Sequence, residues 1–289
     1  MEEPLERRAI ISGAAQSDIG RRLYRSGLDL TVEASLRAIA DAGLTVADID
    51  GISTYPGMGG AFGGCSGAEL HDALRLSLNW RDGAAETSGQ LGAVHKAVLA
   101  VGAGLAKHVL VFRTVVEGSG GAVRASGGGG MGGMPPAFQY LIPYGVTSAA
   151  NWISCYAKRH MHDYGTTREQ LGAIAINART NAASNPKAIY TDPMTMDDYL
   201  GVRMISDPFC LYDCDVPCDG STVVIVSHRD YAPDAPNGAV HINAMGTALR
   251  GRPSWDQFDD LTTMAMRDSA ASMWERTELT AADVDTAQV

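Results

Sequence analysis

Residues 88–116 read SGQLGAVHKAVLAVGAGLAKHVLVFRTVV, which is the pattern of a helix followed directly by a strand. Between Leu91 and Val101 the apolar residues recur with helical spacing, mixed with alanine and glycine that permit close packing. The run that begins at His108 is almost entirely apolar, which is typical of a strand covered on both faces of its sheet. We therefore expect a helix over 88–104 and a buried strand directly after it.

The residues before this pair show the same alternation of strands and helices. We expect a short buried strand over 8–13, a loop over 14–28, and then a helix with Thr31 as its N-cap and Gly43 just after its end. Another strand follows around Ile52. Strands that alternate with helices indicate the α/β class, and we expect a mostly parallel central sheet.

The segment 118–133 holds nine glycines in 16 residues, which predicts a surface loop. Its G-x-G-x-x-G spacing is followed by two prolines where a nucleotide-binding helix would have to begin, so a nucleotide role is not expected. The remaining expected elements are helices over 149–164 and 167–184, the second capped by Thr166 or Thr167, and a buried strand over 221–227.

A seven-residue motif occurs twice in the chain. LTVADID at 44–50 recurs as LTAADVD at 279–285, and each copy follows an apparent helix with a strand candidate before it. Chance similarity in an alanine-rich acidic chain is the alternative, but the matched order favours a duplicated α/β unit. We expect residues 1–232 to form a complete half, with a loop subdomain at about 117–210, and residues 238–289 to begin a second half that is incomplete.

Composition excludes several classes of protein. The net charge is −10, from 23 Lys and Arg against 33 Asp and Glu, which is the wrong sign for binding nucleic acid. The sequence contains no run of 18 apolar residues, which a membrane-spanning helix would need. The charged N-terminus is not followed by an apolar run of the kind that signal peptides contain. We therefore expect a globular protein of the cytoplasm.

The five cysteines do not predict a disulfide framework or a metal site. Their number is odd and none forms a C-x-x-C pair. Cys210, Cys214 and Cys218 are spaced as a helical stripe, but Pro208 and Pro217 argue against a helix there. No metal is expected. The nearby Asp219-Gly220 pair is expected to form a turn that launches the following strand.

Several stretches together resemble the thiolase superfamily, specifically its lipid-transfer protein or sterol-carrier-protein-X branch. The resemblance implies an αβαβα layered fold made of two similar halves, normally a homodimer, that acts on acyl-CoA thioesters. The stretches that carry it are RRAIISGAAQSDIGRR (7–22), DAGLTVADIDGIS (41–53), the helix and strand within 88–116, KRHMHDYGTTREQLGAIAINARTNAASNP (158–186) and DPFCLYDCDVPCDGSTVVIVS (207–227).

The resemblance also implies where chemistry takes place. Thiolases place a nucleophilic cysteine at the start of the buried helix, where backbone N–H groups and the helix dipole stabilise a thiolate. The matching stretch 85–90 reads AETSGQ and has no cysteine. Members of this branch that lack the nucleophilic cysteine resemble aldolases that cleave a β-hydroxyacyl-CoA, including steroid side chains, by a retro-aldol step. Thr87 and Ser88 would then bind the thioester oxygen, and the general base would come from beyond Val289.

Other interpretations of these residues stay open. Ser88 is more often an N-cap in such a position, and as a nucleophile it would need a base, for which His95 is the nearby imidazole. The chain could instead be an acetyltransferase of the thiolase type with another nucleophile. A non-catalytic acyl-CoA or lipid carrier is the third alternative.

The same resemblance implies the binding residues and partners. It implies a coenzyme A thioester as the substrate, no further cofactor, and a small OB-fold partner subunit that binds acyl-CoA. An acidic protein that binds anionic CoA needs a local basic surface. The expected binding residues are the cations Arg124, Lys158, Arg159 and Arg168 and the aromatic residues Tyr140, Tyr144 and Trp152.

Overall fold

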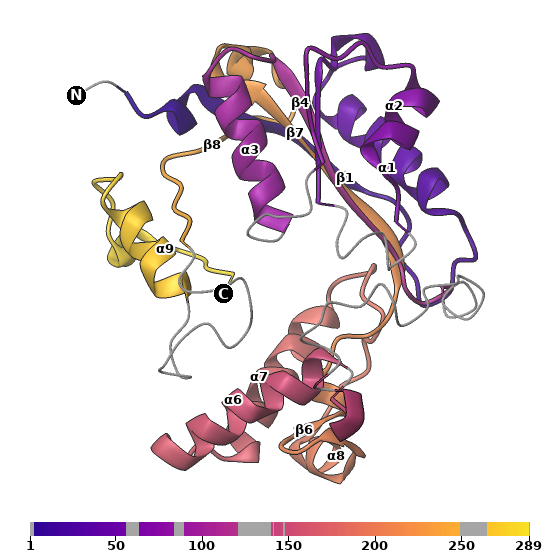
Figure 1. The fold of residues 1–289 in the computed structure, drawn as a ribbon, viewed down its shortest axis with the longest axis vertical. Coiled ribbons are helices and arrows are strands. Elements are labelled where there is room, and N and C mark those ends of the chain that lie inside the picture. Colours follow the sequence, from indigo (N-terminus) through magenta and orange to yellow (C-terminus); the bar gives the residue numbers. More distant parts are fainter. Residues whose placement is uncertain are drawn as a thin grey trace. The chain divides into compact units, whose positions relative to one another are not determined.

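The computed structural model describes residues 3–55, 64–83, 90–120, 140, 142–146, 148–248 and 265–288. The chain divides into two compact units (Figure 1). Unit 1 comprises residues 1–124, 218–247 and 268–289, and unit 2 comprises residues 125–217 and 248–267. Among the described residues, no helix has both the length and the apolar character needed to cross a membrane.

Unit 1 is built on a six-stranded sheet in the order β3-β2-β4-β7-β1-β8. Strand β2 is parallel to β3 and β4, whereas the β4–β7, β7–β1 and β1–β8 pairs are antiparallel. The bounds of the strands are β1 Ala9–Gln16, β2 Gly51–Thr54, β3 Trp80–Asp82, β4 His108–Val116, β7 Asp219–His228 and β8 Val240–His241.

The α/β class is confirmed, but the expectation of a mostly parallel sheet is wrong. Strands β4 and β7 are joined through unit 2 and not through a crossover helix, so they can pair as a long antiparallel ribbon. Strand β1 then pairs antiparallel with the far side of β7.

Helices cover both faces of the sheet (Figure 1). The helices α1, Gly27–Asp41, and α2, Gly67–Leu74, pack on one face, and α3, Gln90–Gly102, packs on the other. Side chains of β4 alternate between these two cores: Leu110 and Phe112 join the α1 and α2 side, whereas Val109 and Val111 join the α3 side. This alternation explains why the β4 sequence is apolar on both faces.

Helix α1 begins earlier than expected. Its N-cap is Ser26, whose hydroxyl accepts a hydrogen bond from the Asp29 backbone N–H at 3.1 Å. The expected cap, Thr31, is instead buried inside the helix, where its hydroxyl donates to the Gly27 carbonyl at 2.6 Å. The cap prediction was wrong because it started from the first apolar-periodic residue and passed over the serine further upstream.

The two copies of the seven-residue motif fold alike. Each forms a single 3-10 turn, η2 at Val46–Asp48 and η7 at Ala281–Asp283, closed by a capping box. The Asp48 carboxylate accepts the Thr45 backbone N–H at 2.8 Å, and Asp283 accepts the equivalent N–H of Thr280 at 2.8 Å. Helix α9, Ala265–Trp274, precedes the second copy as α1 precedes the first. This match agrees with a duplicated unit.

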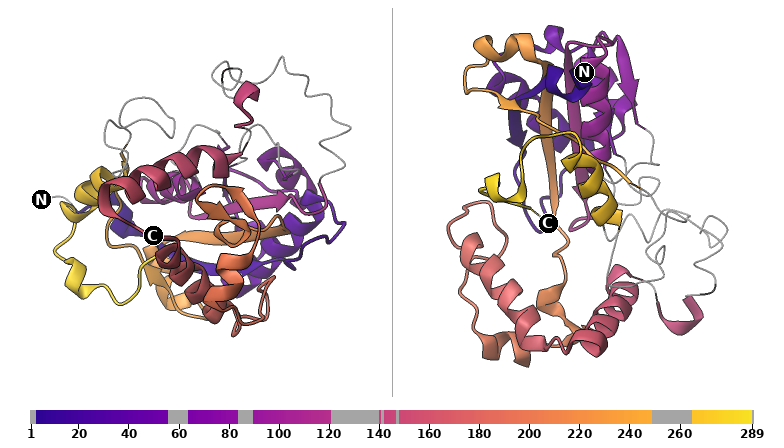
Figure 2. Two further views of the ribbon diagram at one scale, coloured as in Figure 1. Left: turned by 90° about the horizontal axis from the view of Figure 1, so that it is seen from below. Right: turned by 90° about the vertical axis from the view of Figure 1, so that its left-hand side faces the viewer.

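Unit 2 is mostly helical (Figure 2). Two of its helices match the expected ranges, and Thr167 forms the capping box of the second. A small core of Met194, Tyr199 and Cys210 lies between α7, α8 and the segment that follows them. The bounds are α6 Ala149–Tyr164, α7 Arg168–Ala182, α8 Met196–Gly201, β5 Met204–Ser206 and β6 Phe209–Cys210. The remaining short turns of the chain are η1 Leu5–Arg8, η4 Ile142–Tyr144, η5 Leu211–Asp213 and η6 Arg229–Asp234.

Candidate active site

The parallel part of the sheet defines the candidate active site. Because β2, β3 and β4 run in the same direction, their carboxyl ends meet at one edge, and α3, which follows β3, begins at that edge. The Ser53 hydroxyl on β2 donates to the Ala93 carbonyl of α3 at 2.9 Å, which fixes the helix to the strand. Ligands of α/β sheets bind at such carboxyl ends, where helix N-termini offer free backbone N–H groups.

An arginine and a tyrosine lie together near this edge. Arg113 follows the apolar part of β4, and its guanidinium carbon is 4.8 Å from the centre of the Tyr55 ring. Its Nη1 donates to the Tyr55 carbonyl at 3.3 Å. The Tyr55 side chain packs against the apolar cluster on the α3 face. Sequence reasoning missed both residues, although a charged side chain within an otherwise apolar strand was the available signal.

Helix α3 carries two further polar side chains, His95 and Lys96, in its middle. Lys96 Nζ is 2.7 Å from the Asp82 carboxylate at the end of β3. Burial lowers the pKa of His95, so its imidazole is neutral at pH 7. Its Nδ1 is buried without a hydrogen-bond partner in the described structure. A neutral imidazole can act as a general base, although no residue that it would activate contacts it among those that the structure describes.

The expected oxyanion residues Thr87 and Ser88 lie outside the described residues, and so does Arg124. Their assignment stays a prediction. Of the expected aromatic residues, Tyr140 and Tyr144 are 76% and 85% exposed, whereas Trp152 on α6 is partly buried.

The three expected cations of unit 2 make separate local contacts. Lys158 Nζ is 2.5 Å from the Asp207 carboxylate, and Arg159 pairs with Asp163 at 2.6 Å within the same helix. The Arg168 guanidinium carbon is 5.6 Å from the centre of the Tyr199 ring, and the Nε and Nη2 atoms are buried without hydrogen-bond partners in the described structure.

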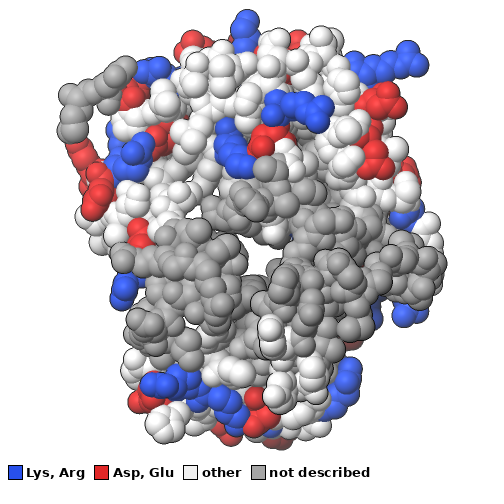
Figure 3. Space-filling model, in the orientation of Figure 1, with Lys and Arg blue, Asp and Glu red and all other residues white. Residues whose placement is uncertain are grey.

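These contacts leave Arg168 as the expected cation that pairs with no carboxylate among the residues the structure describes. On the face shown in Figure 3, Lys and Arg are interspersed with Asp and Glu. That pattern fits an acidic protein with a local, and not a broad, basic surface.

The expectation that Asp219-Gly220 forms a turn is wrong. Asp219 is not part of a turn but the first residue of β7, and it is fully buried. Its carboxylate accepts the backbone N–H groups of Leu23 at 2.8 Å and Ser119 at 3.0 Å, together with the Ser119 hydroxyl. Burial alone would raise the pKa of Asp219, but these hydrogen bonds outweigh it and lower the pKa. The partners are distant in sequence, so an Asp-Gly pair could not reveal them.

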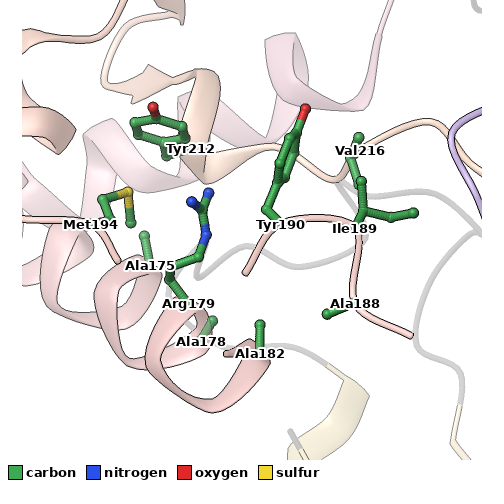
Figure 4. Close-up of a pocket in the computed structure, with 10 residues that line it drawn as sticks. All are labelled: Ala175, Ala178, Arg179, Ala182, Ala188, Ile189, Tyr190, Met194, Tyr212 and Val216. Atoms are coloured by element: carbon green, nitrogen blue, oxygen red, sulfur yellow. The ribbon is translucent and has the colours of Figure 1, made fainter. Parts of the chain in front are cut away.

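A pocket of about 260 Å³ lies wholly within unit 2 (Figure 4). Arg179 lies between two aromatic rings in it, with its guanidinium carbon 5.1 Å from the Tyr190 ring centre and 5.5 Å from that of Tyr212. Its Nη1 donates to the Asp192 carbonyl at 3.1 Å. The remaining lining residues are small or apolar: Ala175, Ala178, Ala182, Ala188, Ile189, Met194 and Val216.

The described residues contain no group of three or more His, Cys, Asp or Glu side chains that could hold a metal ion. Cys210 is buried beside η5, and the Cys214 thiol donates to the Cys210 carbonyl at 3.6 Å. These cysteines therefore make local packing and hydrogen-bond contacts.

Comparison with known proteins identifies relatives along most of the chain. A steroid side-chain-cleaving aldolase of Thermomonospora curvata is 34% identical over 242 residues, which cover 79% of this chain and 59% of that protein. A 17-hydroxy-3-oxo-4-pregnene-20-carboxyl-CoA lyase of Mycobacterium tuberculosis is 30% identical, and the match covers 98% of this chain and 75% of that protein. No family model matches the chain.

A solved structure described as an Ltp2-ChsH2(DUF35) aldolase superposes with a TM-score of 0.84 at 29% identity, covering 97% of this chain and 72% of that one. This chain therefore spans between roughly three fifths and three quarters of the length of these relatives. The fold and the sequence agree in their assignment. The chain belongs to the thiolase superfamily, in the lipid-transfer protein branch whose members include steroid side-chain aldolases.

Proposed function

We propose that this chain takes part in cleaving a carbon–carbon bond of a β-hydroxyacyl-CoA by a retro-aldol step, with a steroid side chain as the substrate class. The observation that carries the proposal is the absence of cysteine from residues 85–90, in a chain related to proteins named as an aldolase and a CoA lyase. Thiolysis needs a nucleophile that forms an acyl-enzyme, whereas lyase chemistry does not.

The reaction requires two groups of the protein: a general base and hydrogen-bond donors for the thioester oxygen. A base removes the proton of the β-hydroxyl, the bond between the α- and β-carbons breaks, and its electron pair moves to the thioester as an enolate. A carbonyl compound leaves, and protonation of the α-carbon gives the shortened acyl-CoA. Hydrogen-bond donors must therefore stabilise negative charge on the thioester oxygen.

We assign these demands to particular parts of the chain. Thr87, Ser88 and backbone N–H groups before Gln90 would donate to the thioester oxygen, and the general base would come from a segment beyond Val289. Arg124, Lys158, Arg159 and Arg168 would attract the phosphates of coenzyme A. The side chains of Tyr140, Tyr144 and Trp152 would line the acyl path.

The proposal extends to assembly and location. The solved relative is named with two components, Ltp2 and ChsH2(DUF35), which supports a small OB-fold partner subunit that binds acyl-CoA. A homodimer would also cover the short edge strand β3 of the sheet. We place the protein in the cytoplasm, where acyl-CoA thioesters are available.

Product analysis tests this function. The chain extended beyond Val289, so that it carries the segment proposed to supply the general base, is incubated alone and with a candidate partner subunit with a steroid β-hydroxyacyl-CoA, and the products are identified by mass spectrometry. The 289-residue chain by itself should be nearly inactive. We expect a steroid ketone or aldehyde together with a shortened acyl-CoA. Combined Thr87→Val and Ser88→Ala substitutions should slow this release. Saturable acyl-CoA binding without cleavage under every condition would instead favour a carrier.

A further inference from the structure

Arg113 is a charged side chain on the α3 face of the central sheet. In β4, Val109 and Val111 pack into the core beneath α3, and Leu110 and Phe112 pack into the opposite core. The strand pairs with β7 without a register shift, so alternation continues and places Arg113 on the same face as the two valines. Its backbone lies two residues beyond Val111, toward the carboxyl end of the strand.

The pairing of β4 with the neighbouring strand β2 shows that Arg113 lies close to the start of α3. Ser53 pairs with Val111, and the Ser53 hydroxyl bonds to the Ala93 carbonyl near the beginning of α3. Tyr55, which directly follows β2, and Arg113 on β4 each lie two residues beyond this pair, and the Arg113 guanidinium stacks on the Tyr55 ring and donates to the Tyr55 carbonyl. Helix α3 runs back along the sheet from this end, so Arg113 belongs to the edge at which the helix begins.

The Arg113 guanidinium is held in place but not neutralised. It is partly buried, it stacks on the Tyr55 ring, and one of its five N–H donors is used by the Tyr55 carbonyl. No carboxylate pairs with it in the parts of the chain that the structure describes. The cation on α3, Lys96, differs because Asp82 neutralises it. A fixed, partly desolvated cation with free donors favours an anionic oxygen.

We infer that Arg113 is an oxyanion-binding residue that stabilises the enolate oxygen of the thioester, and that Tyr55 is the positioning residue that orients it. This inference rests on the proposed function. When the bond between the α- and β-carbons breaks, its electron pair reaches the thioester oxygen, which then accepts N–H bonds from the guanidinium. No redox partner or additional reactant is needed. The gain arises in the transition state because the charge develops there.

The enolisation of bound acetoacetyl-CoA tests the inference directly. This β-ketoacyl thioester forms an enolate whose ultraviolet absorbance can be titrated on the protein, without any turnover. Removing a nearby positive charge should raise the apparent pKa of the bound ligand by about one to two units, because each unit reflects the lost stabilisation of the enolate. We expect this shift in Arg113→Met and a smaller one in Arg113→Lys.

A control variant and a Tyr55 variant separate this role from others. Arg81→Met removes an exposed arginine of β3, whose neighbour Trp80 packs toward α3, so it should leave the enolisation pKa unchanged. Tyr55→Leu removes the ring on which the guanidinium stacks, so it should raise the enolisation pKa by less than Arg113→Met does. Circular dichroism and acetyl-CoA affinity, expected to stay within about twofold, show whether Arg113→Met still folds and binds.

Each outcome has a distinct meaning. An unchanged enolisation pKa in Arg113→Met, with ligand still bound, overturns the role of Arg113 and leaves the proposed function intact. A salt-dependent loss of affinity for free coenzyme A in this variant also overturns it, because the guanidinium would then contact phosphate. If the unaltered protein binds no acyl-CoA at all, the proposed function fails and the inference fails with it.

Discussion

Replacing Arg276 by methionine should lower the free energy of unfolding by about 3 kcal/mol at pH 7, because it leaves a buried carboxylate without its partner. Glu6 is fully buried, and it receives two hydrogen bonds from Arg276, Nε to Oε1 at 2.6 Å and Nη2 to Oε2 at 2.7 Å. Breaking a buried pair costs about 3–5 kcal/mol, and we take the lower limit because 44% of the Arg276 side chain is exposed and solvent screens it.

The expected pH dependence has a definite sign. The hydrogen bonds from Arg276 lower the pKa of Glu6 although burial opposes them. A lowered pKa stabilises the folded protein above the ordinary glutamate pKa of 4.5, and this contribution is lost as pH falls through the lower folded value. Without Arg276, burial remains and the Glu6 pKa rises. The variant should therefore be closest to the unaltered protein in acid and furthest from it at neutral pH.

Urea unfolding followed by circular dichroism at several pH values measures this difference. Glu6→Gln combined with Arg276→Met should recover part of the loss, because no buried charge remains. Arg229→Met, which removes the partner of the exposed Glu3, serves as a control and should have little effect. A loss below about 0.5 kcal/mol at pH 7, or one that grows as pH falls, would refute the reasoning.

Two further predictions concern buried groups of unit 1. Asp219→Asn should lower the free energy of unfolding by about 2 kcal/mol, because an amide group cannot satisfy all the donors that face the carboxylate, and amide exchange at Leu23 and Ser119 should quicken. Equal exchange in both proteins would show that Asp219 does not hold this segment. Burial raises the pKa of Cys65 to about 11, so iodoacetamide at pH 8 should alkylate the exposed Cys155 well before Cys65, as peptide mass mapping can determine. Faster labelling of Cys65 would contradict its burial.

Local patterns in the sequence predict much of unit 1 because they depend on neighbouring residues. The helix and strand of 88–116 correspond to α3 and β4, since apolar spacing reports directly which faces are covered. The repeated motif also folds alike in both copies, because its capping box needs only residues three apart. The direction of β7 could not be predicted this way, since it depends on the insertion of unit 2.

The candidate site shows where sequence patterns fail. An Asp-Gly pair is typical of a turn, yet Asp219 is buried because donors from distant segments, at Leu23 and Ser119, converge on it. The alternation of residues along its strand predicts which face of the sheet Arg113 lies on, but it does not predict that Arg113 contacts Tyr55. Local spacing cannot show such contacts. Thr87 and Ser88 were selected through the family resemblance and stay predictions, as does the division into halves.

The coenzyme A balance of the reaction tests the central claim, that the chain belongs to a lyase and not to an acyltransferase. The chain extended beyond Val289, together with the candidate partner subunit, is given a β-hydroxyacyl-CoA or a β-ketoacyl-CoA, and free coenzyme A and thioesters are counted. Retro-aldol cleavage conserves the number of thioesters, consumes no coenzyme A and releases one carbonyl product. Thiolysis consumes one coenzyme A for each substrate and yields two thioesters. We predict the first balance with the hydroxy substrate and no reaction with the keto substrate; consumption of coenzyme A with the keto substrate would contradict the account.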